Sequence, residues 1–498
     1  MIEDQEHGKR EAELIAARRA NLAALHSLGV DPFTATKFDV TAHAGGIAQA
    51  FADLPAGSDG GDDVLAIAGR LLTKRKMGKA VWADVEDRSG KIQLHVKQDV
   101  VGETAFAVVD VLDRGDLIGV RGQIFRSQKG ELTIRVREVE VLAKSLVPLP
   151  DKWHGLTDVE QRYRRRYVDL IVNAEVRETF IKRSNIVAEL RRFCDTHDFL
   201  EVETPSMHHV AGGAAARPFK THHNALDIPL NMRIATELHL KRLIVGGLER
   251  VYEIGRIFRN EGISAKHNPE FTMMELYAAF WSFEEMMDFN EEMLAHLVSY
   301  VSNGGWELKF GELTLNFERP FARIRYLDAL EKWGDVKRAD LFDFERCKGL
   351  LRGHGLATSP SHAHAIDKLF EKIVEPHLIN PTFVYDMPLI LSPLSKRHPS
   401  DPDLVERYEL FVANMELINA FSELNDPDEQ RKRFEQQALD RLAGDEEAPE
   451  PDWDFVHALE YGMPPTGGMG MGIDRMVMLL TNQHSIRDVI LFPLQRPQ

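Results

Sequence analysis

The chain has 498 residues, 44% of them hydrophobic and 28% charged, which is typical of a globular enzyme of two to four domains. A formal net charge of −17 argues against a protein that coats nucleic acid nonspecifically, but it permits one that grips a single RNA through local basic patches. Cys194 and Cys347 lie far apart without a C-x-x-C motif, and no run approaches the roughly 18 apolar residues of a membrane span, so we expect a cytoplasmic protein without disulfides or a membrane segment.

Residues 1–63 predict an N-terminal helix followed by a connector. The acidic, polar start is unlike a signal peptide. Apolar positions recur between charges through residues 3–28, which is typical of an amphipathic helix, and Gly29 and Pro32 end it. Residues 41–63 are rich in Ala, Gly and Asp, which indicates a loose connector.

Residues 64–146 show the pattern of a small β-barrel. Strand parity places Val81, Ala83 and Val85 inward and leaves Trp82 facing out among charged residues. An outward Trp beside amides and charges favours stacking on an unpaired base, and a dimer or domain contact is the alternative. Short strands separated by turns suggest an OB-type barrel, with strands predicted over 64–74, 80–87, 91–97, 117–126 and 131–142.

The sequence contains two basic clusters, one inside the predicted barrel and one after it, and a linker between them. Residues 70–79 (RLLTKRKMGK) and 161–167 (QRYRRRY) are candidate RNA contacts, although a charge run is usually a solvated face. Residues 147–155 begin Val-Pro-Leu-Pro, which is typical of a stiff linker between domains. We therefore expect a second domain over 156–498.

A long helical pattern opens this second domain. It extends to His197 and leads into a strand over 199–205 that Pro205 closes. A loop over 210–219, rich in Gly and Ala, follows it. A strand and helix are then predicted over 233–244 (RIATELHLKRLI), where Glu237 at the helix start is either a capping carboxylate or a ligand-binding group.

The chain's most informative stretch is a long hairpin over 250–279. Strands are predicted over 250–258 and 271–279, with polar residues and the Asn268-Pro269 turn signal between them. Arg259 ends the first strand, close to the loop. Period two places four side chains of the second strand on one face: Phe271, Met273, Glu275 and Tyr277. A structural Arg–Glu pair is the plainer alternative, but these polar groups are too many and too varied for it.

Two acidic strands are predicted around a turn near Ala413-Asn414 (ERYELFVANMELINAFSELND). The turn places Phe411 opposite Glu416 and makes Glu409 a diagonal neighbour of Glu416 on the same face. Two adjacent carboxylates repel one another unless a cation lies between them. Magnesium, held by carboxylates and substrate phosphates, is the natural occupant.

A glycine-rich strand leads into the last apolar helix (TGGMGMGIDR). Gly468, Gly470 and Gly472 alternate, so one face of this strand is bare backbone that a flat ring can approach. Arg475 follows at the start of the helix, where its guanidinium can meet a nucleotide. A lone G-x-G-x-G often marks a β-bulge instead, and this spacing is not the Rossmann fingerprint.

The string FRNEG…HNPEFTMMELY closely resembles motif 2 of class II aminoacyl-tRNA synthetases, in the form found in bacterial-type lysyl-tRNA synthetases. Residues 176–205 resemble motif 1 of that family and residues 464–480 resemble motif 3. Residues 64–146 resemble its anticodon-binding domain. The resemblance implies an α+β protein: an OB-fold barrel followed by a catalytic domain on a mainly antiparallel sheet flanked by helices.

The resemblance implies an ATP-dependent ligase that attaches lysine to tRNA(Lys) through a lysyl-adenylate, with Mg²⁺ as cofactor and a homodimer formed through residues 176–205. The implied ATP-binding residues are Arg259, Glu261, His267, Phe271, Gly470, Gly472 and Arg475, of which Arg259, Glu261, His267 and Arg475 are also catalytic. The implied lysine-binding residues are Gly213, Glu237, Arg259, Glu275, Tyr277, Asn419 and Glu423. Glu409 and Glu416 would hold the metal, and Arg70, Trp82, Gln93 and Glu131 would contact the anticodon. Trp82 stands where family members often carry Phe, which keeps a stacking surface.

The strand carrying Asn419 and Glu423 poses a parity problem. These residues have the opposite parity to Glu416, yet the resemblance places all of them in one pocket. We therefore predict a β-bulge near Leu417-Ile418.

A buried lysine ammonium needs acceptors, which Glu275, Tyr277 and Glu423 supply. An aspartate pocket would need Arg or Lys instead, and we expect none at these positions. Aspartyl- and asparaginyl-tRNA synthetases remain the nearest alternatives. A non-catalytic nucleic-acid-binding protein on the same scaffold, or a ligase that attaches lysine to a protein, is a further alternative. The retained charged residues argue against the former, and the N-terminal barrel argues against the latter.

Overall fold

The structure is a computed structural model that describes residues 2–150, 156, 158–357, 359, 361–442 and 450–497. The chain divides into two units, Met1–Leu156 and Thr157–Gln498. The linker predicted over 147–155 lies outside the described residues from 151 onward. Among the described residues, no helix combines the length and apolar character needed to cross a membrane.

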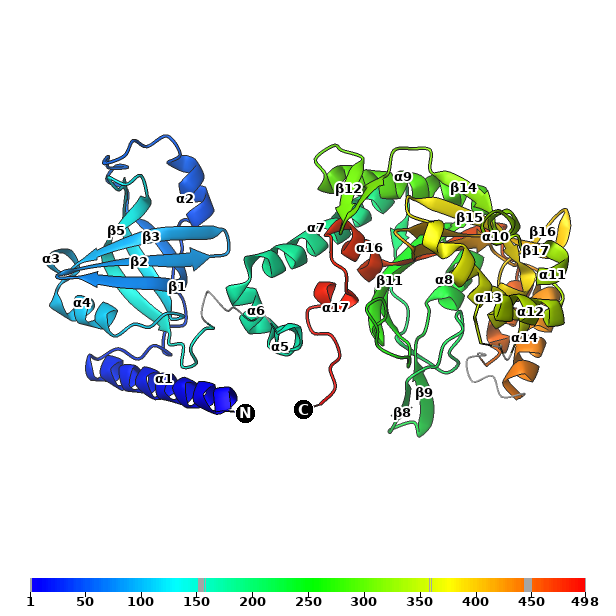
Figure 1. Ribbon diagram of the computed structural model, residues 1–498. Coiled ribbons are helices and arrows are strands. Elements are labelled where there is room, and N and C mark those ends of the chain that lie inside the picture. Colours follow the sequence, from blue (N-terminus) through cyan, green and yellow to red (C-terminus); the bar gives the residue numbers. More distant parts are fainter. Residues whose placement is uncertain are drawn as a thin grey trace. The chain divides into compact units, whose positions relative to one another are not determined.

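A closed barrel forms the core of the first unit, which confirms the predicted barrel (Figure 1). Its strands are hydrogen-bonded in the order β1 (Leu65–Met77), β2 (Ala80–Asp87), β3 (Gly90–Lys97), β5 (Leu132–Ala143) and β4 (Leu117–Arg126). Val81, Ala83 and Val85 are buried inside it, as parity predicts. Three short helices were not expected from the sequence: α2 (Ala44–Ala50) within the connector, and α3 (Gln98–Val101) and α4 (Glu103–Asp110) between β3 and β4.

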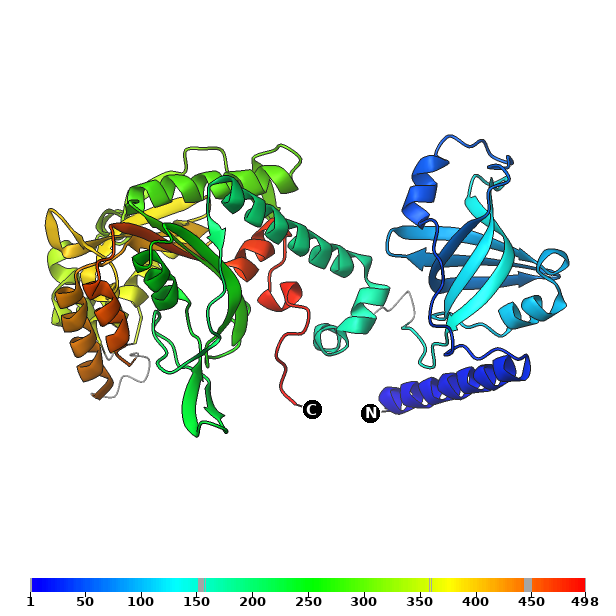
Figure 2. The ribbon, with the colours of Figure 1, turned by 180° about the vertical axis from the view of Figure 1, so that it is seen from behind.

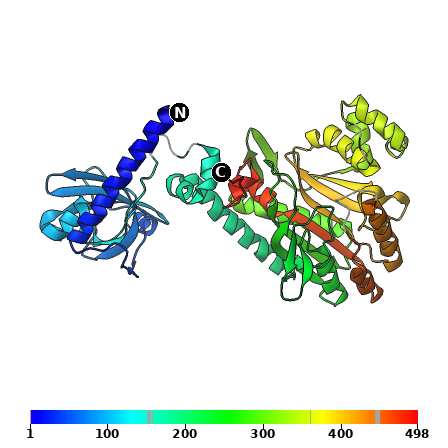
Figure 3. The same cartoon turned by 90° about the horizontal axis from the view of Figure 1, so that it is seen from below.

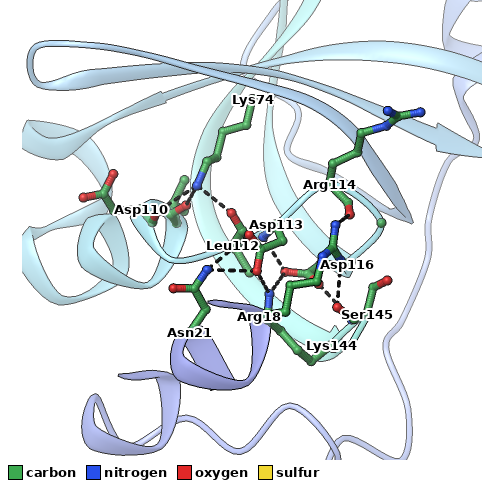
Figure 4. A network of polar contacts seen from close by, with 12 residues as sticks. Arg18, Asn21, Lys74, Asp110, Leu112, Asp113, Arg114, Asp116, Lys144 and Ser145 are labelled. Carbon is green, nitrogen blue, oxygen red and sulfur yellow. Dashed lines mark hydrogen bonds and ion pairs between the residues drawn. The ribbon is translucent and has the colours of Figure 1, made fainter. Parts of the chain in front are cut away.

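Helix α1 (Ile2–Ser27) lies across the barrel and is anchored to it by a polar network (Figures 3 and 4). Arg18 donates to the main-chain oxygens of Ser145 (2.7 Å) and Arg114 (2.6 Å). Lys144, whose side chain is fully buried, pairs with Asp113 and Asp116. Because each buried charge has a partner, this network holds α1 in place without an unpaired charge.

A mainly antiparallel sheet organises the second unit, as predicted. Its strands run in the order β14 (Ala322–Arg325), β15 (Thr382–Pro388), β17 (Asp401–Val412), β18 (Met415–Ser422), β19 (Thr466–Gly472), β11 (Glu270–Ala279), β10 (Arg250–Phe258) and β6 (Leu200–Glu201), with β16 (Arg397–His398) beside β17. The pairs β14–β15 and β10–β6 are parallel.

The two faces of this sheet have different roles. One face carries Met274 and Leu276 and packs in one core with α7 (Ala174–Thr196), α9 (Phe283–Val301) and α16 (Ile473–Leu480) (Figure 2). Tyr277 alternates with these residues and faces the other way, toward α8 (Glu237–Val245) and α15 (Trp453–Glu460). The second face is therefore the one that carries the polar residues of β11.

The remaining elements include two small separate sheets and several helices. They are α5 (Val159–Arg164), α6 (Arg166–Val172), β7 (Met207–His208), β8 (Lys220–His223), β9 (Ile228–Met232), β12 (Glu307–Phe310), β13 (Leu313–Asn316), α10 (Tyr326–Gly334), α11 (Arg338–Leu341), α12 (Phe344–Gly353), α13 (His362–Ile373), η1 (Glu375–His377), η2 (Leu389–Leu391), α14 (Pro427–Leu442) and α17 (Ile486–Val489).

Three expectations for the start of this unit are corrected. The single long helix is broken at Asn173, whose extended backbone lets its side chain donate to Asp169. The strand over 199–205 is reduced to Leu200–Glu201. The cluster over 161–167 is partly structural, because Arg166 is buried and bonded to Asp169 and to C-terminal carbonyl groups.

Candidate active site

A cavity of about 450 Å³ lies in the second unit on the polar face of the sheet. Of the residues predicted to bind lysine, ATP or the metal, Glu409 and Glu423 do not line it. The predicted residues that do line it are Gly213, Glu237, Arg259, Glu261, His267, Phe271, Glu275, Tyr277, Glu416, Asn419, Gly470, Gly472 and Arg475. The chain thus brings together residues from segments that are far apart in sequence.

Arg259 follows the end of β10 and reaches the cavity beside β11. Its Nε donates to the main-chain oxygen of Ile234 (3.4 Å), and its guanidinium carbon lies 5.3 Å from the centre of the Phe271 ring. Burial lowers the pKa of Arg259, but an arginine stays charged in proteins. The cavity therefore contains a fixed cation stacked against an aromatic ring.

Glu275 is a buried carboxylic acid in the cavity wall. It accepts hydrogen bonds from the main-chain nitrogen of Thr236 (3.0 Å) and from the hydroxyl of Tyr277 (3.3 Å). Burial, helped by the nearby Glu237, raises its pKa to about 7. The group is thus poised to ionise when a cation arrives.

A lysine that the sequence reasoning missed lies behind this wall. Lys241, on α8, is fully buried and pairs with Glu237 (2.5 Å) and with Glu423. The expectation that positions 275, 277 and 423 carry no Lys or Arg holds, but it did not foresee a lysine one layer behind them. The i, i+4 spacing from Glu237 to Lys241 is the signal that could have revealed the pair.

Glu423 is placed one layer behind the cavity rather than in its lining. One carboxylate oxygen pairs with Lys241, and the other, Oε1, has no hydrogen-bond partner among the residues that the structure describes. Gly468 separates it from the cavity: a Cβ at that position would lie 2.0 Å from Oε1. Burial raises the pKa of Glu423 well above its ordinary value.

His267 and Arg475 both line the cavity and contact each other there. Arg475 Nη2 lies 3.0 Å from His267 Nε2, and Nη1 donates to the main-chain oxygen of Glu416 (2.9 Å). Because an arginine can only donate, His267 accepts at Nε2 and donates from Nδ1 to Ser264 (2.9 Å). Burial and the charge of Arg475 lower the pKa of His267, which agrees with a neutral ring.

A bulge in β18 lets residues at both odd and even positions of that strand line the cavity. Leu410 pairs with Ile418 and Phe411 pairs with Glu416, so Leu417 is the extra residue. The hairpin turn at Ala413 and Asn414 has positive φ at both residues, as a tight two-residue turn requires. The predicted bulge and the predicted pairing of Phe411 with Glu416 are confirmed.

Glu409 and Glu416 differ in their surroundings. Glu409 pairs with Arg407 (2.6 Å), a cation that sequence reasoning missed, whereas Glu416 is 41% exposed. Burial raises the pKa of Glu409 to about 8; Arg407 opposes the shift and Glu416 adds to it. Within the described residues, no group of three or more His, Cys, Asp or Glu side chains is arranged to hold a metal. A metal here would need further ligands, such as phosphate oxygens.

The outer face of the barrel carries three of the predicted anticodon residues side by side. Trp82 stacks on His95 with ring centres 4.0 Å apart, and Phe125 lies 6.0 Å from His95. Gln93 accepts from the hydroxyl of Thr133, which is also bonded to the main chain of Glu131. His95 was missed, although its parity with Gln93 could have revealed it. The guanidinium of the fourth residue, Arg70, is turned to the main-chain oxygen of Gly115 (2.7 Å).

Comparisons with known proteins agree with this arrangement. A family model described as class II tRNA synthetases (D, K and N) matches residues 158–496, and one described as an OB-fold nucleic acid binding domain matches residues 65–142. The lysine–tRNA ligase of Moorella thermoacetica is 52% identical over 490 residues, 98% of this chain and 99% of its own. Those of Carboxydothermus hydrogenoformans (53%; 98% of both chains) and Bacillus subtilis (48%; 99% of this chain and all of its own) are also similar.

Proposed function

The chain belongs to the lysine–tRNA ligase family of class II synthetases and attaches lysine to tRNA. From this premise we propose that the cavity makes lysyl-adenylate from lysine and ATP. One lysine carboxylate oxygen attacks the α-phosphorus, and the bond from that phosphorus to the β-bridging oxygen breaks. Pyrophosphate leaves with the electron pair, and no proton moves.

Arg259 is the proposed centre of this step. Carboxylate and phosphate repel one another, so the enzyme must position both and neutralise their charge. Arg259 is the cation that can face both groups, and Phe271 beside it offers a ring on which adenine can stack. Arg475 and His267 would receive the γ-phosphate end, with Glu261 nearby. The bare strand at Gly470 and Gly472 leaves room for the nucleotide.

The proposed choice of lysine rests on the acidic wall, which is the observation that carries this proposal. Glu275 is buried on the cavity surface with Tyr277 bonded to it, and Glu423 lies just behind. An ammonium that leaves water needs such acceptors. Gly213, Glu237 and Asn419 line the same cavity, and we assign the α-amine of the substrate to Glu237 beside Gly213. Aspartate or asparagine would leave these carboxylates without a cation.

Glu409 and Glu416 are the proposed magnesium-holding residues. Each carboxylate adds negative charge near the other, so the donor set suits a hard dication. The metal, when bound, would neutralise the phosphates.

The second step is proposed to transfer lysine to tRNA(Lys). A terminal ribose hydroxyl attacks the carbonyl carbon of the adenylate, the bond from that carbon to the phosphate oxygen breaks, AMP leaves with the electron pair, and the hydroxyl proton is released to solvent. The barrel would hold the anticodon, with Trp82 stacking on a base and Gln93, Glu131 and Arg70 reading base edges.

We also propose a homodimer through residues 176–205 and a cytoplasmic location. Ile181 of α7 and Leu200 of β6 are about half exposed (50% and 51%), and β6 is an edge strand. An apolar edge of this kind favours contact with a second copy. Sedimentation of the purified chain would test this, with a single species at the monomer mass as the contradicting result.

Charging of total tRNA with radiolabelled lysine tests the proposed function. We expect lysine on the lysine-accepting tRNA and on no other, and only when ATP and Mg²⁺ are present. Label on a protein rather than on tRNA, or no transfer at all, would contradict it.

A further inference from the structure

Lys241 is a charged residue that the mechanism above does not use. It lies on the buried face of α8 beside Leu240 and Ile244, with none of its side chain exposed. Its ammonium is enclosed by Glu237, by Glu423 and by the rings of Phe421 (5.5 Å) and Phe455 (5.8 Å). A buried cation that ties together two binding-site carboxylates needs an explanation beyond helix packing.

The ammonium of Lys241 uses one oxygen of each carboxylate. It bonds Oε1 of Glu237 and contacts Oε2 of Glu423. Each remaining oxygen lies near a glycine: Oε2 of Glu237 lies 3.8 Å from where a Cβ of Gly213 would be, and Oε1 of Glu423 lies against Gly468. Both glycines line the cavity. Lys241 thus holds one oxygen of each carboxylate and leaves the second oxygen of each for another cation.

The charges around this point match the proposed substrate. Glu237, Glu275 and Glu423 carry three negative charges when ionised, and Lys241 cancels one of them. Two negative charges remain, and free lysine brings two ammonium groups. The substrate's own carboxylate is left for Arg259.

We propose that Lys241 is a positioning and specificity-determining residue, whose ammonium aligns Glu237 and Glu423 and sets the charge of the pocket to match the two ammonium groups of lysine. This inference rests on the function proposed above. Lys241 does not line the cavity; it acts through Glu237, which does, and through Glu423, which lies behind Gly468.

The surroundings of Lys241 contain few other charges that could replace it. From β11, Glu275 and Tyr277 face the same carboxylates. Arg242, the next residue of α8, turns away and pairs with Asp452 (2.9 Å) and with Asp454 on α15 (2.9 Å). Although burial lowers the pKa of Lys241, the two carboxylates outweigh it and raise that pKa, so the side chain keeps its charge. Removing Lys241 would raise the pKa of Glu423 further, because the ammonium is the nearby cation that opposes the effect of burial.

The test compares Lys241→Met, Lys241→Arg and the matched control Arg242→Met in ATP–pyrophosphate exchange. The Michaelis constant for lysine is measured from pH 6 to pH 8.5, and that for ATP at pH 7.5. For Lys241→Met, we expect the lysine constant to rise about tenfold at pH 7, and the midpoint of its pH profile to move up by about one unit. The constant for ATP should stay close to that of the unmodified protein.

The two other variants separate charge from packing. Arg242→Met removes a neighbouring cation from the same helix. It should leave the pH dependence of the Michaelis constant for lysine unchanged, even if it lowers the unfolding temperature. Lys241→Arg keeps the charge and should keep the midpoint of the profile, although its larger head raises the lysine constant. This second variant decides the matter if Lys241→Met does not fold.

Two results would overturn the inference. One is a pH dependence of the Michaelis constant for lysine that has the same midpoint in Lys241→Met as in the unmodified protein. The other is an upward shift of that midpoint in Lys241→Arg as large as in Lys241→Met. Absence of lysine-dependent exchange in the unmodified protein would instead contradict the proposed function, so the two failures are distinguishable.

Discussion

Phe411 lies directly opposite Glu416 across the β17–β18 ladder, although its neighbour Leu410 lies opposite Ile418. Leu417, the extra residue of β18, reverses which face of the sheet the following side chains point to. Glu416 and Asn419, three positions apart, therefore both reach the cavity, which a regular strand would not allow. The proposed metal-holding and lysine-binding residues depend on this bulge for their common location.

Replacing Glu409 or Glu416 by Gln should raise the Mg²⁺ concentration needed for half-maximal pyrophosphate exchange by about tenfold or more, because each change removes a charged oxygen ligand. A magnesium titration at saturating ATP and lysine measures it. Glu406→Gln, on the opposite parity of the same strand as Glu409, is the matched control and should change nothing. An unchanged magnesium requirement in both site variants would exclude this metal position.

Glu423→Gln should raise the Michaelis constant for lysine by about 100-fold or more, and that for ATP far less. The variant keeps the shape of the side chain but replaces a charged acceptor of the substrate ammonium and leaves Lys241 with one carboxylate. Pyrophosphate exchange at varied lysine and varied ATP separates the two constants. Equal effects on both substrates would count against the assignment.

Gly468→Ala should weaken lysine binding. Its Cβ would lie 2.0 Å from Oε1 of Glu423 and 2.5 Å from the ring of Tyr277, and both side chains are buried. Gly472→Ala is the steric control, because its Cβ would meet nothing closer than the carbons of Arg475 at 3.8 Å. Calorimetric titration with lysine compares the two variants. The prediction fails if Gly468→Ala binds lysine as the unmodified protein does.

Lysine binding should tighten as pH rises from 6 to 8. Burial raises the pKa of Glu275 to about 7, and its ionised form is the one that binds an ammonium. The ionised fraction rises about tenfold over this range, so the dissociation constant should fall by about the same factor. The same raised pKa stabilises the ligand-free fold at low pH, and this contribution is lost as pH rises through 7. Dissociation constants measured by calorimetry at pH 6, 7 and 8 check the first effect. Binding that is independent of pH, or that weakens, would remove Glu275 from the lysine site.

His95→Ala should raise the Michaelis constant for tRNA by roughly tenfold and leave pyrophosphate exchange unchanged. The stack of Trp82 on His95 would lose its second ring, and base stacking is worth about 1–3 kcal/mol. His95→Phe keeps a ring and should restore tRNA charging. Loss of exchange activity in His95→Ala would show a defect unrelated to the anticodon.

Much of the site could be predicted because strand parity is a local property. Period two alone places Phe271, Glu275 and Tyr277 on one face. The bulge in β18 is predicted by the mismatch between its strand parity and the single pocket that the family resemblance implies. Strand parity could not reveal Lys241, because it lies on a helix; its i, i+4 spacing from Glu237 is a local signal, whereas its partner Glu423 is distant in sequence. The break at Asn173 depends on a local side-chain bond, which competes with the helix and leaves no periodic trace.

ATP–pyrophosphate exchange with each of the twenty amino acids in turn tests the central claim most directly. An acidic wall opposite a fixed arginine predicts exchange with lysine and with no other natural amino acid. Exchange driven by aspartate or asparagine, or no exchange with lysine, would contradict the account.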